Sequence, residues 1–255
     1  MKKILITAGP TNEYIDEVMK ITNMSTGRLG VELTRNFLNS NCEVTLICTR
    51  SVVRSGLFEK YGLATKANLK TLPIETTEDM YNALKSEQGN NYDLVIHASA
   101  VGDYKPEFSF KMEDMAKEIL MVVQKDRSYK AILEVLTNPK CKLKDDTKIS
   151  SYEPNLTVKL TLTTKLISNL KQWFPNSILV GFKLLENVSK QHLIDVAQKL
   201  CIKNNMDYII ANDLADLRKG NHVSYLVNKD GYLNHEFHSP DDIYKKTYSF
   251  TEREC

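Results

Sequence analysis

Cysteine is scarce in this chain, and its pattern argues against two kinds of site. The five cysteines are odd in number, and no two of them form a C-x-x-C pair. This pattern argues against a disulfide framework and against a zinc site. Unpaired cysteines of this kind are typical of the reducing cytoplasm, where we expect the protein to work.

Long apolar runs and a large charge of one sign are also absent. The longest apolar stretches, such as 94–101, are interrupted and far shorter than the roughly 20 residues of a membrane span. The apolar run at 4–8 ends at Gly9-Pro10, below the roughly 7 residues of a signal peptide. Lysine and arginine number 34 against 32 acidic residues, a net charge of +2. We therefore expect no membrane partner and no dedicated nucleic-acid surface.

Two signatures of a dinucleotide-binding fold are missing. No G-x-G-x-x-G follows the first predicted strand, and the strand at 43–48 ends without the acidic residue that binds an NAD ribose. Arg50 at that end could meet an NADP phosphate, although a lone surface arginine is usually solvated. A nucleotide-cofactor oxidoreductase is therefore the weaker interpretation, and we keep it as an alternative.

Short apolar runs rich in β-branched residues alternate with helical patterns. The expected strands are 3–8, 43–48, 69–74, 93–98, 156–162, 177–182 and 207–211, and the expected helices are 27–39, 78–87, 164–173 and 189–204. This alternation predicts an open, mostly parallel, Rossmann-like α/β sandwich of three layers. Two runs joined by Lys229-Asp230-Gly231 predict a C-terminal β-hairpin over 223–237. We expect residues 1–255 to form a single domain.

Residues 105–147 do not fit this alternation. They contain two weak helical patterns, 112–125 and 129–136, which are separated from the next strand by Asn138-Pro139. An α/β unit needs only a short link at this point, so the segment is interpreted either as an inserted lid or dimerisation segment, or as decoration without a function.

The ends of the predicted strands contain the candidate ligand-binding residues, because open α/β sheets bind ligands there. Ser25-Thr26-Gly27 begins a helix and leaves room for a phosphate at free N–H groups, although Ser25 or Thr26 could be an ordinary N-cap. Small residues around Ser99 would let a flat ring approach the backbone. Asp103 could hold a ribose hydroxyl or a magnesium-bound water, or simply cap a turn. His97 lies in an apolar run and is expected in the core.

Three lysines could face a triphosphate. Lys148 precedes a predicted strand, and Lys199 and Lys203 lie on one face of a predicted helix. Each of them could equally be a solvated surface residue. Thr163-Thr164-Lys165 begins a helix after a strand and is a second candidate phosphate site. From the residues alone we predict an α/β enzyme that binds a phosphorylated, nucleotide-like ligand.

Six segments, taken in order, resemble the phosphopantothenoylcysteine synthetase family, also called phosphopantothenate–cysteine ligase. They are LITAGPT at 5–11, ITNMSTG at 21–27, ASAVGDY at 98–104, KISS at 148–151, GFKL at 181–184 and IIAND at 209–213. The resemblance implies the stand-alone bacterial form, a homodimer that ligates L-cysteine to 4′-phosphopantothenate in coenzyme A biosynthesis. It implies an acyl-nucleotidylate intermediate, with release of pyrophosphate and a nucleoside monophosphate. It also implies Mg²⁺ and CTP as co-substrate, and ATP is the alternative because the KISS form resembles animal enzymes.

The resemblance also places the functional residues of the family on this sequence. The catalytic positions fall on Asn23, which would contact the acyl-nucleotidylate, and on Lys148, which would bind phosphate. The nucleotide contacts fall on Gly9, Ser25, Thr26, Gly27, Ser99, Asp103, Lys148, Thr164, Lys165, Leu166, Ile167, Phe182, Lys199 and Lys203. Met19 stands where the family often has arginine, and Lys20 is the candidate to supply that charge. No metal ligands are identified, and a non-enzymatic phosphopantothenate- or nucleotide-binding regulator is the third interpretation.

Overall fold

The computed structural model describes residues 1–143, 148–150, 152 and 154–252. The end of the predicted 105–147 segment and the last residue of the 148–151 motif therefore lie outside the described residues. The chain divides into two compact units. Unit 1 contains residues 1–11, 23–101 and the chain from Thr164 onward, and unit 2 contains residues 12–22 and 102–163. The second unit is thus larger than the predicted insertion.

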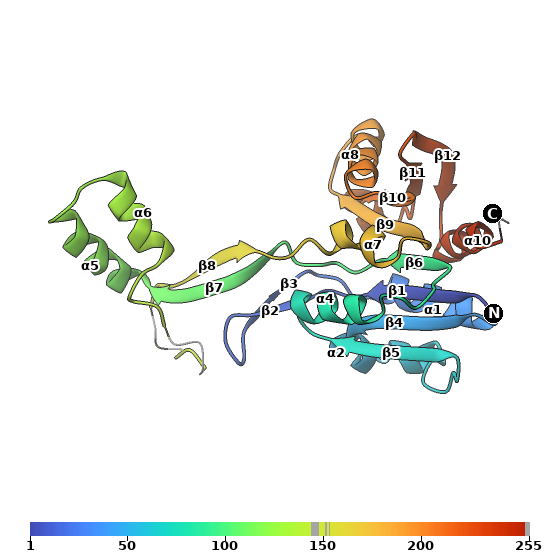
Figure 1. Cartoon of the computed structure of the whole chain (residues 1–255), viewed down its shortest axis with the longest axis horizontal. Coiled ribbons are helices and arrows are strands. Elements are labelled where there is room, and N and C mark those ends of the chain that lie inside the picture. The colour runs from blue at the N-terminus through green and yellow to red at the C-terminus, as the bar shows by residue number, and fades with distance from the viewer. Residues whose placement is uncertain (144–147, 151, 153, 253–255) are drawn as a thin grey trace. The chain divides into compact units, whose positions relative to one another are not determined.

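Unit 1 is built on a mixed sheet that the sequence largely predicted (Figure 1). Its strand order is β12-β11-β10-β9-β6-β1-β4-β5. The strands are β1 (Lys3–Ala8), β4 (Glu43–Thr49), β5 (Leu69–Ile74), β6 (Leu94–His97), β9 (Ile178–Leu185), β10 (Tyr208–Asp213), β11 (Ser224–Asn228) and β12 (Gly231–Phe237). The pairs from β10 to β5 are parallel, and the β11–β12 hairpin is antiparallel and ends the sheet. The Rossmann-like fold class and the C-terminal hairpin are confirmed.

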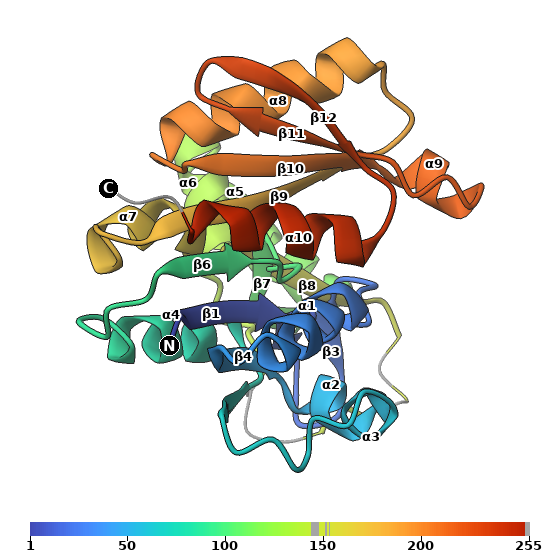
Figure 2. The same cartoon turned by 90° about the vertical axis from the view of Figure 1, so that its right-hand side faces the viewer.

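Helices cover both faces of this sheet. In Figure 2, α1 (Arg28–Asn39) and α10 (Pro240–Phe250) lie in front of it, and α2 (Arg50–Arg54) and α3 (Leu57–Lys60) follow β4. The other face is covered by α4 (Thr77–Ser86), the 3₁₀ helix η1 (Leu166–Asn169), α7 (Leu170–Trp173) and α8 (Lys190–Lys203), while α9 (Leu214–Arg218) follows β10. Alternate residues of β1 enter the two cores, since Ile4 and Ile6 pack with Phe37, whereas Leu5 packs with Leu84. No described helix is long and apolar enough to cross a bilayer.

Unit 2 corrects one strand assignment. Residues 156–162 are not part of the parallel sheet, because β8 (Leu156–Leu162) pairs antiparallel with β7 (Tyr104–Lys111). A second small ribbon pairs β2 (Asn12–Tyr14) with β3 (Lys20–Thr22), and the predicted helical patterns form α5 (Met112–Val123) and α6 (Tyr129–Thr137). Phe108, Phe110, Met115 and Val135 form a small core of their own.

Candidate functional site

The start of α1 is shaped by two glycines that approach each other closely. Gly9 follows β1 with a φ of +83°, and Gly27 precedes α1 with a φ of +72°. A Cβ on Gly27 would lie 2.7 Å from Cγ2 of Val52 and 3.0 Å from the backbone nitrogen of Gly9. Both positions therefore require glycine, for the left-handed conformation and for space. The loop after β1 is packed directly against the first turn of α1.

The first turn of α1 has no side-chain cap, so the interpretation of Ser25 or Thr26 as an ordinary N-cap is wrong. The N-cap is Gly27, not Ser25 or Thr26. The Ser25 and Thr26 hydroxyls accept only long bonds of 3.4 Å, from the N–H groups of Gly27 and Arg28. Among the described residues, the N–H groups of the next two positions, 29 and 30, have no acceptor. Such free N–H groups at a helix N-terminus suit an anion.

Asn23 joins the α1 loop to the loop that follows β6. Its Nδ2 donates to the carbonyl oxygens of Ala100, at 3.1 Å, and Val101, at 3.2 Å. Ala100 in turn donates its N–H to the Gly9 carbonyl at 3.0 Å. The amide of the predicted catalytic asparagine thus connects the two loops by hydrogen bonds.

The end of β6 carries a buried histidine and an unsatisfied hydroxyl. His97 is buried, its Nδ1 is hydrogen-bonded to the Thr7 hydroxyl at 2.9 Å, and burial lowers its pKa to about 4. The expectation that His97 belongs to the core is confirmed. Ser99 donates its N–H to the same Thr7 hydroxyl, while its own buried Oγ has no partner among the described residues. Such an orphan hydroxyl suits a polar ligand atom.

The four residues predicted at 164–167 divide between surface and core: Thr164 and Lys165 are exposed, whereas Leu166 and Ile167 pack in the core. The expected helix begins later, at Leu166, and its first part is the 3₁₀ helix η1. The Leu166 side chain is 2% exposed, and Cδ1 of Ile167 would lie 3.3 Å from a Cβ on Gly181. The exposed residues Thr164 and Lys165 are therefore more accessible to a ligand than the side chain of Leu166.

Phe182 and the lysine pair lie on different parts of unit 1. Phe182 is half-buried in β9, one residue beyond Gly181, which is in register with His97 near the carboxyl end of β6. Lys199 and Lys203 are exposed near the C-terminal end of α8, which runs back toward the amino end of β10. The structure therefore does not bring these lysines to the strand ends at Gly9 and Ser99.

Asp103 and Lys148 belong to unit 2. Asp103 accepts the N–H of Thr163 at its backbone carbonyl, where β7 and β8 meet, and its side chain is exposed. Lys148 is exposed, and the N–H of the next residue, Ile149, donates to Oδ2 of Asp16 at 2.9 Å.

Sequence reasoning did not identify Asp16, a buried residue at the turn between β2 and β3. Its Oδ1 accepts the N–H groups of Val18 and Met19 at 2.7 and 2.6 Å. The N–H of Met19 lowers the pKa of Asp16 most, followed by those of Ile149 and Val18. Asp16 thus ties the β2–β3 turn to the backbone beside Lys148. Only the tendency of aspartate to form such turns signals this role in the sequence.

The described residues offer no ready metal centre. No group of three or more histidine, cysteine, aspartate or glutamate side chains gathers among residues 1–143, 148–150, 152 and 154–252 in a way that could hold a metal ion.

Comparison with known proteins identifies the family. Residues 1–140 match the family model described as DNA/pantothenate metabolism flavoprotein C-terminal domain. Over 230 residues the chain is 31% identical to the coenzyme A biosynthesis bifunctional protein CoaBC of Thermococcus kodakarensis, covering 90% of this chain and 45% of that protein. The CoaBC of Bacillus subtilis is 27% identical over 238 residues, covering 91% and 46%. The chain thus spans about half the length of these relatives.

Solved structures agree with this result. The DNA/pantothenate metabolism flavoprotein from Streptococcus pneumoniae is 33% identical, with a TM-score of 0.76 and coverage of 99% of both chains. A Cab2 variant in complex with phosphopantothenate-cysteine shares the fold at 18% identity, with a TM-score of 0.65 and coverage of 98% of this chain and 86% of that one. The family expected from the sequence motifs is confirmed, and the chain belongs to the family of the DNA/pantothenate metabolism flavoprotein C-terminal domain.

Proposed function

We propose that this chain ligates L-cysteine to 4′-phosphopantothenate through an acyl-nucleotidylate, as one step of coenzyme A biosynthesis. The family match and the CoaBC relatives support this proposal. The observation that carries it is the start of α1, where the uncapped N–H groups at 29 and 30 follow the close contact of Gly9 and Gly27. This arrangement suits a phosphate chain, and the orphan Ser99 hydroxyl suits a further polar atom of the nucleotide.

The proposed chemistry has two steps. The carboxylate of 4′-phosphopantothenate attacks the α-phosphorus, the bond to the β-phosphate oxygen breaks, and pyrophosphate leaves. The cysteine amine then attacks the acyl carbon, a proton is lost from nitrogen, and the nucleoside monophosphate leaves. The protein mainly positions the reactants and stabilises the charge that grows on phosphate oxygens.

Each proposed residue contributes to one of these tasks. Asn23 would orient the acyl-phosphate between the two loops that it joins, and Lys148 would neutralise phosphate charge. The proposed nucleotide contacts are Gly9, Ser25, Thr26, Gly27, Ser99, Asp103 and Phe182, with the backbone of Thr164, Lys165, Leu166 and Ile167. Lys199 and Lys203 are left out of this mechanism, because α8 carries them toward the amino end of β10.

We propose CTP as the nucleotide, with Mg²⁺ bound to its triphosphate, and ATP as the alternative. The family resemblance supports CTP, whereas the KISS form at 148–151 resembles the ATP-using enzymes. Direct competition between equal concentrations of the two nucleotides would decide, since the ratio of their kcat/KM values measures the preference.

We also propose a cytoplasmic homodimer. Two helices of unit 2 leave apolar side chains exposed, among them Leu120 and Met121 on α5 and Leu133 on α6. By contrast, Ile119 and Val122 already pack against the unit's own small core. Light scattering at micromolar concentration tests the dimer, and a monomer with full activity would contradict it.

The decisive assay supplies 4′-phosphopantothenate, L-cysteine, Mg²⁺ and either CTP or ATP. Pyrophosphate, the nucleoside monophosphate and the amide product are expected in equal amounts. Omitting cysteine should leave at most one equivalent of pyrophosphate per site, because the acyl-nucleotidylate then has no acceptor. Binding of the substrates without turnover would favour the regulator, and no product with either nucleotide would refute the ligase.

A further inference from the structure

The first residue of α1 is a cation placed where a helix disfavours cations. Arg28 begins the helix, and the first turn contains no acidic residue. The N-terminus of a helix carries partial positive charge, so Arg28 is repelled by the dipole of its own helix. Its pairing with Glu32 has the cation before the anion, which is the less favourable order for residues four apart. Helix stability alone therefore does not explain why an arginine occupies the first position of α1.

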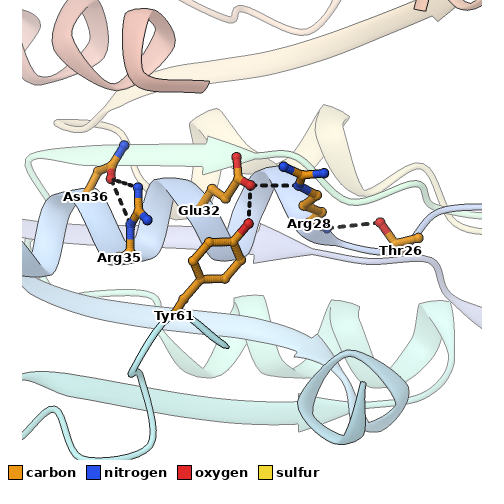
Figure 3. A network of polar contacts seen from close by, with 6 residues as sticks. All are labelled: Thr26, Arg28, Glu32, Arg35, Asn36 and Tyr61. Atoms are coloured by element: carbon orange, nitrogen blue, oxygen red, sulfur yellow. Dashed lines mark hydrogen bonds and ion pairs between the residues drawn. The ribbon is translucent and has the colours of Figure 1, made fainter. Parts of the chain in front are cut away.

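Two other side chains hold this arginine in place (Figure 3). Oε1 of Glu32 accepts a hydrogen bond from Nε of Arg28 at 2.7 Å and another from the hydroxyl of Tyr61. Glu32 is only 8% exposed, and burial by itself would raise the pKa of its carboxyl group. The bonds from Tyr61 and Arg28 outweigh burial and bring the pKa below its ordinary value. Glu32 is therefore a buried, charged carboxylate that receives two donors on one oxygen.

The same arrangement leaves the far end of the arginine available. The Arg28 side chain is 65% exposed; its Nε donates to Glu32, and its guanidinium also interacts with the hydroxyl of Tyr61. The guanidinium has more N–H donors than these two contacts use, so donors on its exposed terminal amino groups remain for an external acceptor. They belong to the same helical turn as the N–H groups at 29 and 30, which also lack acceptors within the described chain. An anion at this turn would relieve the repulsion between the cation and the helix dipole.

We propose that Arg28 binds phosphate oxygens of the nucleotide through its terminal amino groups, and that Glu32 and Tyr61 are its positioning residues. The proposal rests on the proposed function for the nature of the ligand. Arginine suits this role better than lysine, because a planar guanidinium can bond a carboxylate through Nε and a phosphate through its amino groups at once. The phosphate could instead be that of 4′-phosphopantothenate, and the kinetic measurements below distinguish the two sources.

The first test measures binding without turnover. Calorimetric titration with inorganic tripolyphosphate compares the wild type with Arg28→Ala and with the matched control Arg35→Ala. Arg35 lies seven residues later on the same helix, bonds to Asn36 and stacks on Tyr61, so its removal changes the net charge equally. We expect roughly tenfold weaker binding for Arg28→Ala, typical of losing a charge-assisted hydrogen bond, and a change of less than about twofold for Arg35→Ala.

The second test separates the KM for each substrate from kcat. Arg28→Ala should raise the KM for the nucleotide about tenfold and leave the KM for 4′-phosphopantothenate unchanged, because the lost contact is to the nucleotide. Glu32→Gln and Tyr61→Phe should raise the nucleotide KM by a smaller factor, with thermal unfolding midpoints confirming that all variants fold. The Arg28 proposal is refuted by unchanged tripolyphosphate binding in Arg28→Ala, by equal losses in Arg35→Ala, or by a rise confined to the KM for 4′-phosphopantothenate. A wild type without ligase activity would refute the proposed function alone, since tripolyphosphate binding would still decide the role of Arg28.

Discussion

Replacing Gly27 by alanine tests whether the close contact between the β1 loop and α1 is essential. The new methyl group would lie 2.7 Å from Cγ2 of Val52 and 3.0 Å from the Gly9 nitrogen, closer than packed atoms come. A left-handed conformation costs a non-glycine residue roughly 1–2 kcal/mol. Overpacking adds about 1–3 kcal/mol, because a backbone atom cannot simply turn away. The expected total is a loss of about 2–5 kcal/mol of unfolding free energy.

Gly56→Ala is the matched control for this substitution. Gly56 is also a left-handed N-cap, with a φ of +77°, but a Cβ there would meet nothing within 4 Å. It carries the conformational cost without the clash. At about 2–4 °C per kcal/mol for a chain of this size, Gly27→Ala should melt roughly 2–12 °C below Gly56→Ala in a calorimetric scan. Equal melting temperatures would show that the loops separate without cost, and the reasoning about the α1 start would be wrong.

Three further predictions concern the proposed chemistry and the pH dependence of stability. Lys148→Ala should raise the activation barrier for pyrophosphate release by about 2–4 kcal/mol, as for other groups that stabilise growing charge. Near-normal turnover in the folded variant would exclude the residue from the mechanism. Asn23→Asp should lower both turnover and the melting temperature, because the new carboxylate would face the carbonyl oxygens of Ala100 and Val101, to which the amide donates. Wild-type turnover together with a wild-type melting temperature would contradict this. Burial lowers the pKa of His97 to about 4 in the folded chain, whereas its ordinary value is 6.5. Between these two pH values the unfolded chain therefore binds a proton on His97 that the folded chain does not bind. The unfolding free energy should therefore fall by up to about 3 kcal/mol as the pH drops from 6.5 to 4. Urea titrations at several pH values should show a smaller fall of the unfolding free energy in His97→Gln than in the wild type. An equal fall in both proteins would contradict the burial argument.

The parallel strands were predictable because their apolar residues are nearly continuous, as expected for strands that are covered on both faces. The strand at 156–162 was placed in the wrong sheet although its pattern differs. Its apolar residues alternate with polar ones, as in Leu156, Val158 and Leu160. Alternation of this kind is typical of antiparallel strands, and β8 does pair antiparallel with β7. The partner strand β7 escaped prediction because lysines and Pro106 interrupt its pattern.

The candidate site was predictable in part, and the missing part depends on tertiary contacts. The segments around Gly9, Asn23 and Ser99 could be located from the sequence, because each follows or precedes a recognisable element. The spacing of Arg28 and Glu32 is also readable as a helical pair. Nothing in the sequence shows that Tyr61, from the far end of α3, donates to Glu32, since such a contact depends on packing rather than on local pattern.

At the strand ends, main-chain hydrogen bonds connect the loops, and charged side chains are proposed to bind the phosphates. The loops after β1 and β6 are joined by main-chain bonds, with the Ala100 N–H on the Gly9 carbonyl and the Thr11 N–H on the Ala100 carbonyl. Asn23 adds its amide to the same carbonyl of Ala100. These contacts hold the two loops of the proposed nucleotide site together without a ligand, so that less conformational entropy of the loops is lost on binding. Arg28 at the start of α1 would then supply phosphate-binding charge beside these joined loops, in addition to the charge proposed for Lys148.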